Sequence, residues 1–208
     1  DFMRAKSCLL IVVSIVSLII PVFARQASAC GHDGFYMGFG YDQIFMYTPE
    51  GQYSGVGANL GKITFSPGFG ALGIFGYDFC GSRWGIQMPF EFTRQKLNHF
   101  EWVNQFGSTL EGVLHLVEWG NGIDIHLVGG VGWSYLSEGS AQNRSSSAGV
   151  TVDFGPGFSY YFSRAENVSA ALSLEVPFRM INYFNDRLSK NGTTIVAVPL
   201  RVMLQVGF

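Results

Sequence analysis

The sequence predicts an all-β fold: an eight-stranded, antiparallel, up-and-down transmembrane β-barrel preceded by a cleavable signal peptide. Three observations lead to this fold class. The 208 residues include 27 Gly and 19 Phe but only 13% charged residues, a composition typical of short aromatic strands joined by tight turns. Apolar residues recur at every second position over segments of strand length, which is the period of a β-strand. Short and long connections alternate between these segments, as they do in outer-membrane barrels.

The first 29 residues are expected to be an export signal. A cationic start precedes the apolar run of residues 8–22, and the small residues 27–29 (Ala-Ser-Ala) form a cleavage site. A retained membrane helix is the alternative, but the run is shorter than the about 20 residues that a bilayer requires, and Pro21 interrupts it. The barrel domain is therefore expected at residues 30–208.

Eight segments of the barrel domain have the length and alternation of membrane-crossing strands. They are residues 34–47, 68–79, 83–93, 108–119, 123–135, 149–162, 168–181 and 193–208. Short turns are expected at residues 80–82, 120–122 and 163–167, and long loops at residues 48–67, 94–107, 136–148 and 182–192. In outer-membrane barrels the short turns lie in the periplasm and the long loops lie outside the cell.

Each segment is assigned from its own residues. In six segments one row is apolar and free of charge, and these rows begin, in chain order, at Phe35, Phe69, Trp84, Val150, Val168 and Val196. The segments 108–119 and 123–135 flank Asn121-Gly122, the plainest hairpin signal in the chain. Aromatic residues near both ends of the strands, Trp84 and Trp119 at the short turns and Trp133 and Tyr135 at the long loops, are expected to form two interfacial girdles.

The rows opposite the apolar rows carry the ionisable side chains. A charge on the lipid side costs several kcal/mol at the bilayer midplane, so these rows are expected to face the lumen. The expected lumenal network consists of Glu91, Glu111, His115, Asp124, His126, Asp153, Glu175, Arg179 and Arg201. Because an eight-stranded barrel is just wide enough for side chains to fill it, we expect this network to close the lumen to solutes.

Residues 34–41, 68–79 and 83–86 resemble the opening strands of small Gram-negative outer-membrane β-barrels of the OmpX, OmpA-membrane-domain and opacity-protein type. Phe208 resembles the signal that the outer-membrane assembly machinery reads. The resemblance implies a location in the bacterial outer membrane, with outer-membrane lipids, lipopolysaccharide and the assembly machinery as partners. It implies no single activity, since the family's roles include adhesion, envelope integrity and immune evasion.

Two cysteines, Cys30 and Cys80, remain after signal cleavage. One precedes the first strand and the other follows the second, so a hairpin brings both to the periplasmic rim, where a disulfide can form. The alternative is that residues 27–30 form a lipobox and Cys30 is acylated. The sequence leaves both possibilities open.

Several sequence patterns match part of a cofactor-binding, catalytic or metal-binding motif, but none of them is complete. The G-x-G-x-x-G pattern at residues 68–73 lacks the helix that a dinucleotide site requires. Asp124, His126 and Ser134 share a row, and a Ser/His/acid set could hydrolyse an acyl ester, as in lipid A deacylases. However, His126 and Ser134 are about 26 Å apart along a strand, and the His-x-Ser pair that the deacylase resemblance needs is absent. The four histidines are scattered in sequence, and we expect no catalytic residue, metal site or cofactor.

Because no catalytic set assembles in the sequence, we expect a structural or surface-interaction protein that displays its long loops to an extracellular partner. The loop residues expected to be displayed are Tyr53, Lys62, His99, Trp102, Glu138, Arg144, Asn185, Arg187 and Lys190. The alternatives are a lipid-modifying enzyme of the lipid A deacylase type, a narrow passive channel, and a soluble lipocalin-like binder. Nucleic acid is not expected as a partner, because the cations are scattered rather than clustered.

Overall fold

The computed structural model describes residues 34–47, 65–79, 81–97, 101–119, 122–138, 145–165, 168–184 and 193–208. Both the expected signal peptide and the two cysteines, Cys30 and Cys80, lie outside these residues.

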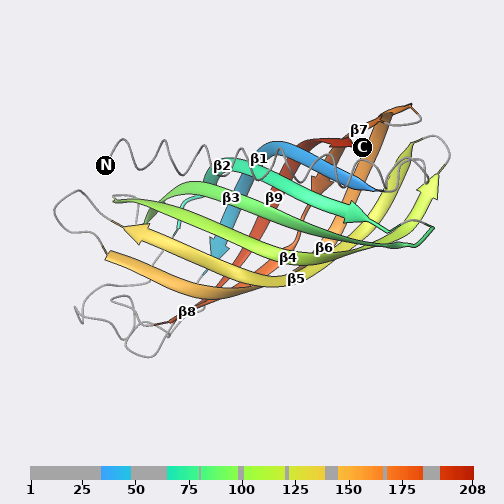
Figure 1. The fold of residues 1–208 in the computed structure, drawn as a ribbon. Coiled ribbons are helices and arrows are strands. Elements are labelled where there is room, and N and C mark those ends of the chain that lie inside the picture. The colour runs from blue at the N-terminus through green and yellow to red at the C-terminus, as the bar shows by residue number, and fades with distance from the viewer. Residues whose placement is uncertain are drawn as a thin grey trace, which may run out of the picture.

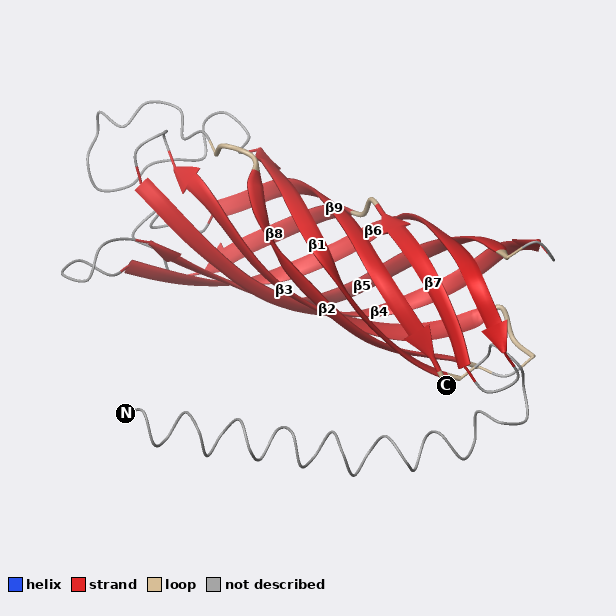
Figure 2. Ribbon diagram, turned by 90° about the horizontal axis from the view of Figure 1, so that it is seen from above, coloured by secondary structure: helices blue, strands red, loops and turns tan. Residues whose placement is uncertain are grey.

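The described residues form one closed antiparallel barrel (Figures 1 and 2). Its strands are β1 (Phe35–Tyr47), β2 (Gly68–Asp78), β3 (Trp84–Leu97), β4 (Glu101–Trp119), β5 (Ile123–Glu138), β6 (Ser145–Ala165), β7 (Val168–Glu175), β8 (Phe178–Phe184) and β9 (Thr193–Gly207). The first and last strands pair over their length, from Tyr36 opposite Gly207 to Tyr47 opposite Val196, so the sheet has no free edge. The β2–β3, β4–β5 and β6–β7 connections mark one end of the barrel, here called the turn end; the other is the loop end.

Strands β7 and β8 occupy one position in the wall. Both pair with β6 on one side and with β9 on the other, and their register against β9 is continuous, from Glu175 opposite Arg201 to Arg179 opposite Ala197. The interruption is at Val176-Pro177, and this register places Pro177 opposite Pro199. Neither proline has an N–H group to donate to the ladder. The segment predicted at residues 168–181 is therefore one membrane crossing that is interrupted at Val176-Pro177, and the barrel wall has eight strand positions.

The strands reach further toward the loop end than the sequence predicts. Residues 94–107 are expected to be a loop, but β3 continues to Leu97 and β4 starts at Glu101, with Arg94 paired to Asn104. The expected loop at residues 136–148 is similarly shortened by β5 and β6. These extensions carry no regular apolar row, so hydropathy misses them, although backbone hydrogen bonding continues the ladder.

Large apolar side chains point outward around the barrel. Phe39 is 68% exposed and Phe154 is 62% exposed, whereas Arg201 and Glu175 are fully buried. Soluble proteins rarely expose contiguous apolar surface on this scale, so the outward belt fits a bilayer. Trp84, Trp133 and Tyr135 are exposed on it, as girdle residues would be; the side chain of Trp119 is outside the described set. None of the described residues forms a helix long and apolar enough to cross a membrane.

Candidate functional site: the lumen of the barrel

The middle of the lumen is organised around the guanidinium group of Arg201, which enters from β9. Its three nitrogens donate hydrogen bonds to four carboxylates: Nε to Glu91 at 2.8 Å, Nη1 to Glu175 at 3.0 Å, and Nη2 to Glu111 and Asp153, each at 2.9 Å. A buried charge is tolerated only when it is paired and hydrogen-bonded. Five strands therefore contribute one side chain each to a single buried cluster.

A second arginine, Arg179 on β8, binds two of the same carboxylates. Its Nε and Nη2 contact the two oxygens of Asp153 at 2.8 and 2.7 Å, which is the bidentate geometry that guanidinium groups favour. Its Nη1 and Nη2 also reach both oxygens of Glu91. The two arginines thus share Glu91 and Asp153.

These ion pairs cross the lumen from one side to the other. Arg179 lies on the β7–β8 position and Glu91 on β3, four of the eight wall positions away. Arg201 on β9 and Glu111 on β4 are separated by the same half circumference. Ion pairs therefore join opposite sides of the barrel wall at this level.

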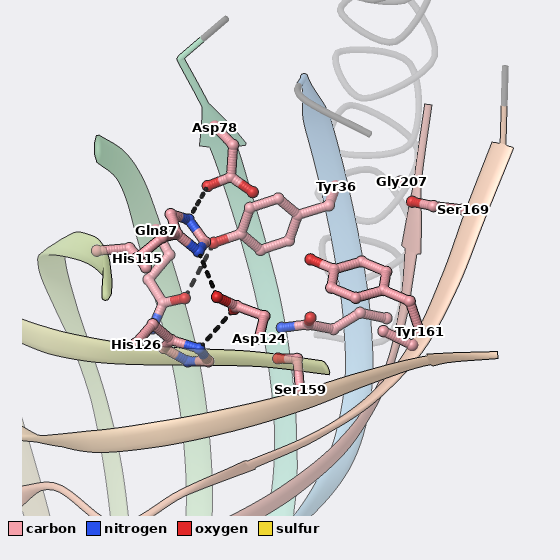
Figure 3. A pocket seen from close by; sticks show the side chains of 13 residues that line it. Tyr36, Asp78, Gln87, His115, Asp124, His126, Ser159, Tyr161, Ser169 and Gly207 are labelled. Atoms are coloured by element: carbon pink, nitrogen blue, oxygen red, sulfur yellow. Dashed lines mark hydrogen bonds and ion pairs between the residues drawn. The ribbon is translucent and has the colours of Figure 1, made fainter. Parts of the chain in front are cut away.

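A cluster of His and Asp side chains occupies the turn end of the lumen (Figure 3). His115 Nδ1 lies 3.1 Å from Asp124 Oδ1, and His126 Nδ1 lies 2.9 Å from Asp124 Oδ2. The far nitrogen of His115 faces Asp78 Oδ1 at 3.2 Å, and that of His126 faces Glu175 Oε1 at 3.6 Å. Figure 3 shows both rings turned toward the Asp124 carboxylate, which lies between them.

The backbone next to this cluster is irregular. His115 and His126 are directly opposite in the β4–β5 ladder, and the register then shifts by one residue before Val117. Leu116 and Val117 are both exposed, so the bulge turns two successive side chains outward. Bulges are common at barrel rims and re-aim neighbouring side chains, and this one ends the alternation next to His115.

The His and Asp cluster is connected to the central network through Glu175, which faces His126 Nε2 at 3.6 Å and accepts a hydrogen bond from Arg201. Gln87 binds the same carboxylate. The Gln87 amide nitrogen donates to Glu111 at 2.7 Å and to Glu175 at 3.1 Å, and its oxygen accepts from Tyr36 Oη at 3.0 Å. Tyr36, Gln87 and the cluster line a small cavity of about 20 Å³, which holds about one water molecule.

The loop end of the lumen contains an apolar plug. Eight buried residues pack together there: Ile44, Met46, Val103, Leu136, Ile181, Tyr183, Ile195 and Ala197. This apolar plug differs from the polar filling that the sequence predicts for the lumen. The sequence does carry a signal for the plug. Ile181 and Tyr183 follow Arg179 at every second position, and Ile195 and Ala197 precede Arg201 in the same way, so these apolar residues share the lumenal rows of the two arginines.

The structure brings all nine expected network residues into the lumen, in two connected groups. Among the side chains described there, six carboxylates and two arginines are buried, giving a formal sum of 2 − 6 = −4 before the histidines are counted. The sixth carboxylate, Asp42, has no hydrogen-bond partner for either oxygen among the described residues. Phe208 closes the β1–β9 seam, where its backbone nitrogen donates to Phe35 at 2.8 Å.

The Ser/His/Asp arrangement weighed for a deacylase is not assembled. Ser134 Oγ contacts Gln105 Nε2 and Tyr183 Oη, each at 3.0 Å, at the loop end. His126 contacts Asp124 at the opposite end of the lumen. A nucleophile must lie within hydrogen-bond reach of its base, and these two residues do not.

No protein-family model matches the chain, and no curated protein does. Several solved structures match in fold. Neisserial surface protein A gives a TM-score of 0.56 at 14% identity, over 84% of this chain and 97% of its own. The outer membrane protein OprG from Pseudomonas aeruginosa gives 0.51 at 12% identity, over 86% and 97%. The chain has the fold of a small outer-membrane β-barrel. The predicted fold class is thereby confirmed as a closed eight-position barrel, and the fold and its apolar belt indicate the bacterial outer membrane.

Proposed function

We propose that this protein is a non-enzymatic outer-membrane barrel whose closed lumen makes it a rigid anchor for its long connections. The observation that carries this proposal is the set of ion pairs across the full width of the lumen, from Arg179 to Glu91 and from Arg201 to Glu111. The apolar plug at the loop end fills a second level. A barrel filled at two levels is suited to holding loops rather than to passing solutes.

The extracellular partner is proposed to contact the connections at the loop end. Most of the residues expected to be displayed lie outside the described part of the chain: Tyr53, Lys62, His99, Arg144, Asn185, Arg187 and Lys190. Trp102 is an exception, because it lies in β4 and is 40% exposed.

A lipid contact is proposed on the outer face of the barrel near the loop end. The guanidinium of Arg94 lies 4.7 Å from the centre of the Trp102 ring, and Lys96 Nζ lies 5.0 Å from it. Two cations held on one aromatic ring, just above the apolar belt, suit the phosphate groups of lipopolysaccharide. This contact would anchor the barrel in the outer leaflet.

The closed lumen is tested by electrical recording of the purified barrel in planar bilayers. We expect no stable conductance steps from the wild type. Leu136→Ala is also expected to remain silent, because the charged level still fills the lumen. Insertion is verified by the heat-modifiable gel migration of protein recovered from the bilayer lipid. Stable, ion-selective steps from the wild type would overturn the proposal.

The non-enzymatic part of the proposal has its own test. Folded protein is incubated with lipopolysaccharide, and the lipid A is analysed by mass spectrometry. We expect every acyl chain to be retained. Loss of an acyl chain that depends on folded protein would favour the lipid-modifying alternative instead.

A further inference from the structure

We propose that His115, Asp124 and His126 form a binding site for one divalent transition-metal ion of the zinc class at the turn end of the lumen. One possible ligand atom from each of the three residues lies within 4.8 Å of the others. Ligand atoms bound tetrahedrally at about 2.0–2.1 Å are separated by about 3.3 Å, so small side-chain rotations bring this set together around an ion.

The donor types select the class of metal. Two imidazoles and a carboxylate suit borderline ions such as Zn²⁺, and they lack the oxygen-rich shell that Ca²⁺ and Mg²⁺ require. Three protein ligands leave a fourth position for water. The adjoining cavity of about 20 Å³ has room for that water molecule.

The groups around the ligands are those that metal sites use to orient histidines. A ligating imidazole almost always donates its second N–H to a carboxylate, a carbonyl or water. Here each ring turns one nitrogen to Asp124 and the other to a further carboxylate, Asp78 for His115 at 3.2 Å and Glu175 for His126 at 3.6 Å. Both rings are therefore held with Nδ1 directed at the site.

The charge of the lumen also favours a cation at this place. The buried carboxylates described in the barrel outnumber the buried arginines by six to two. Both arginines donate hydrogen bonds to carboxylates of the central network, and neither contacts Asp124. A divalent ion between Asp124 and the two imidazoles would supply positive charge where no arginine reaches.

The backbone leaves space for these side chains. A Cβ placed on Gly157 of β6 would lie 2.1 Å from His126 Nε2, so the imidazole occupies the space that a side chain at position 157 would fill. The side chains are close to the rim but not open to it: His115 is 10% exposed, His126 5% and Asp124 2%. An ion would enter from the turn end through the cavity.

The site is tested by titrating the folded, untagged barrel in detergent with ZnCl₂ in a calorimeter. We expect one ion per chain. His126→Gln and Asp124→Asn should each weaken binding at least 100-fold, whereas Asp78→Asn should weaken it about 10-fold, the usual effect of removing an outer-shell partner. His99→Gln is the matched control, and it should bind as the wild type does.

A second measurement does not depend on the folding of variants. X-ray absorption of the zinc-loaded wild type should show nitrogen and oxygen ligands with imidazole scattering and no sulfur. Heat-modifiable migration confirms that each variant used in calorimetry is folded. Absence of stoichiometric binding to the wild type, unchanged binding to folded His126→Gln, or sulfur ligands from the cysteines would each overturn the proposal.

Discussion

The Cα of Gly157 lies directly against the imidazole of His126, so that a single added methyl group would lie 2.1 Å from its Nε2 atom. The two residues are opposite each other in the β5–β6 ladder and face the lumen together. The absence of a side chain on β6 thus decides where a histidine of β5 can lie.

Replacing Gly157 by alanine should destabilise the barrel by about 1–3 kcal/mol, the usual cost of overpacking a filled interior. The imidazole must shift to accommodate the methyl group, which disturbs its contacts with Asp124 and Glu175. Gly112→Ala is the control, because a Cβ there meets its nearest neighbour at an ordinary 3.8 Å. Urea unfolding of both variants in lipid vesicles measures the difference. Equal stabilities would contradict the packing described.

Replacing Arg201 by methionine should destabilise the barrel by about 3–5 kcal/mol, because the buried carboxylates lose their shared partner. Asp42→Asn is a contrasting change in the same layer. Neither oxygen of Asp42 has a hydrogen-bond partner among the described residues, so this variant should lie within about 1 kcal/mol of the wild type. Unfolding free energies from urea titration measure both, and a larger cost for Asp42→Asn than for Arg201→Met would refute this assignment of roles.

Truncating the apolar plug should cost more than truncating the outer belt. Leu136 is fully buried among side chains at the loop end, and its replacement by alanine leaves a cavity, with an expected cost of about 2–5 kcal/mol. Val198 is 36% exposed on the outer face, where fluid lipid fills the space left by Val198→Ala. Equilibrium unfolding should rank Leu136→Ala well below Val198→Ala in stability; the reverse order would mean that the plug is not packed.

The pair of cations on Trp102 should strengthen the interaction with lipopolysaccharide. Each cation near an anionic surface contributes about 1 kcal/mol, so Arg94→Gln combined with Lys96→Gln should weaken binding about 30-fold. Arg83→Gln, which removes an exposed cation at the turn end, should have little effect. Binding to lipopolysaccharide-containing nanodiscs measures both, and an equal loss for Arg83→Gln would show that only total charge matters.

The fold could be predicted from the sequence because the bilayer imposes a simple rule on the strands. Lipid-facing positions such as Phe39, Phe154 and Leu204 must be apolar, so the period of two is visible in the chain. The same rule places Glu91 and Arg201 inside. Beyond the lipid no such rule applies. The sequence pattern therefore does not show that β3 continues to Leu97 or that β4 starts at Glu101.

The contacts within the lumen could not be predicted, because they depend on which strands face each other across the barrel. Arg179 and Glu91 are 88 residues apart in sequence, and no local pattern joins them. His115 and His126 appear scattered in sequence, yet the β4–β5 hairpin places them opposite each other. The apolar plug differs from the charged filling expected for the lumen, because the inner rows carry ionisable groups at mid-lumen and apolar side chains such as Ile181 and Ile195 toward the loop end.

The central claim is that lipid surrounds the apolar rows and that the opposite rows fill the lumen. Photo-crosslinking tests it most directly, with p-benzoylphenylalanine placed at Phe154, which is 62% exposed, or at Tyr183, which is fully buried, in barrels folded into lipid vesicles. We expect the probe at position 154 to crosslink to lipid acyl chains and the probe at position 183 to crosslink only within the protein. Lipid adducts at position 183 and none at position 154 would contradict the claim.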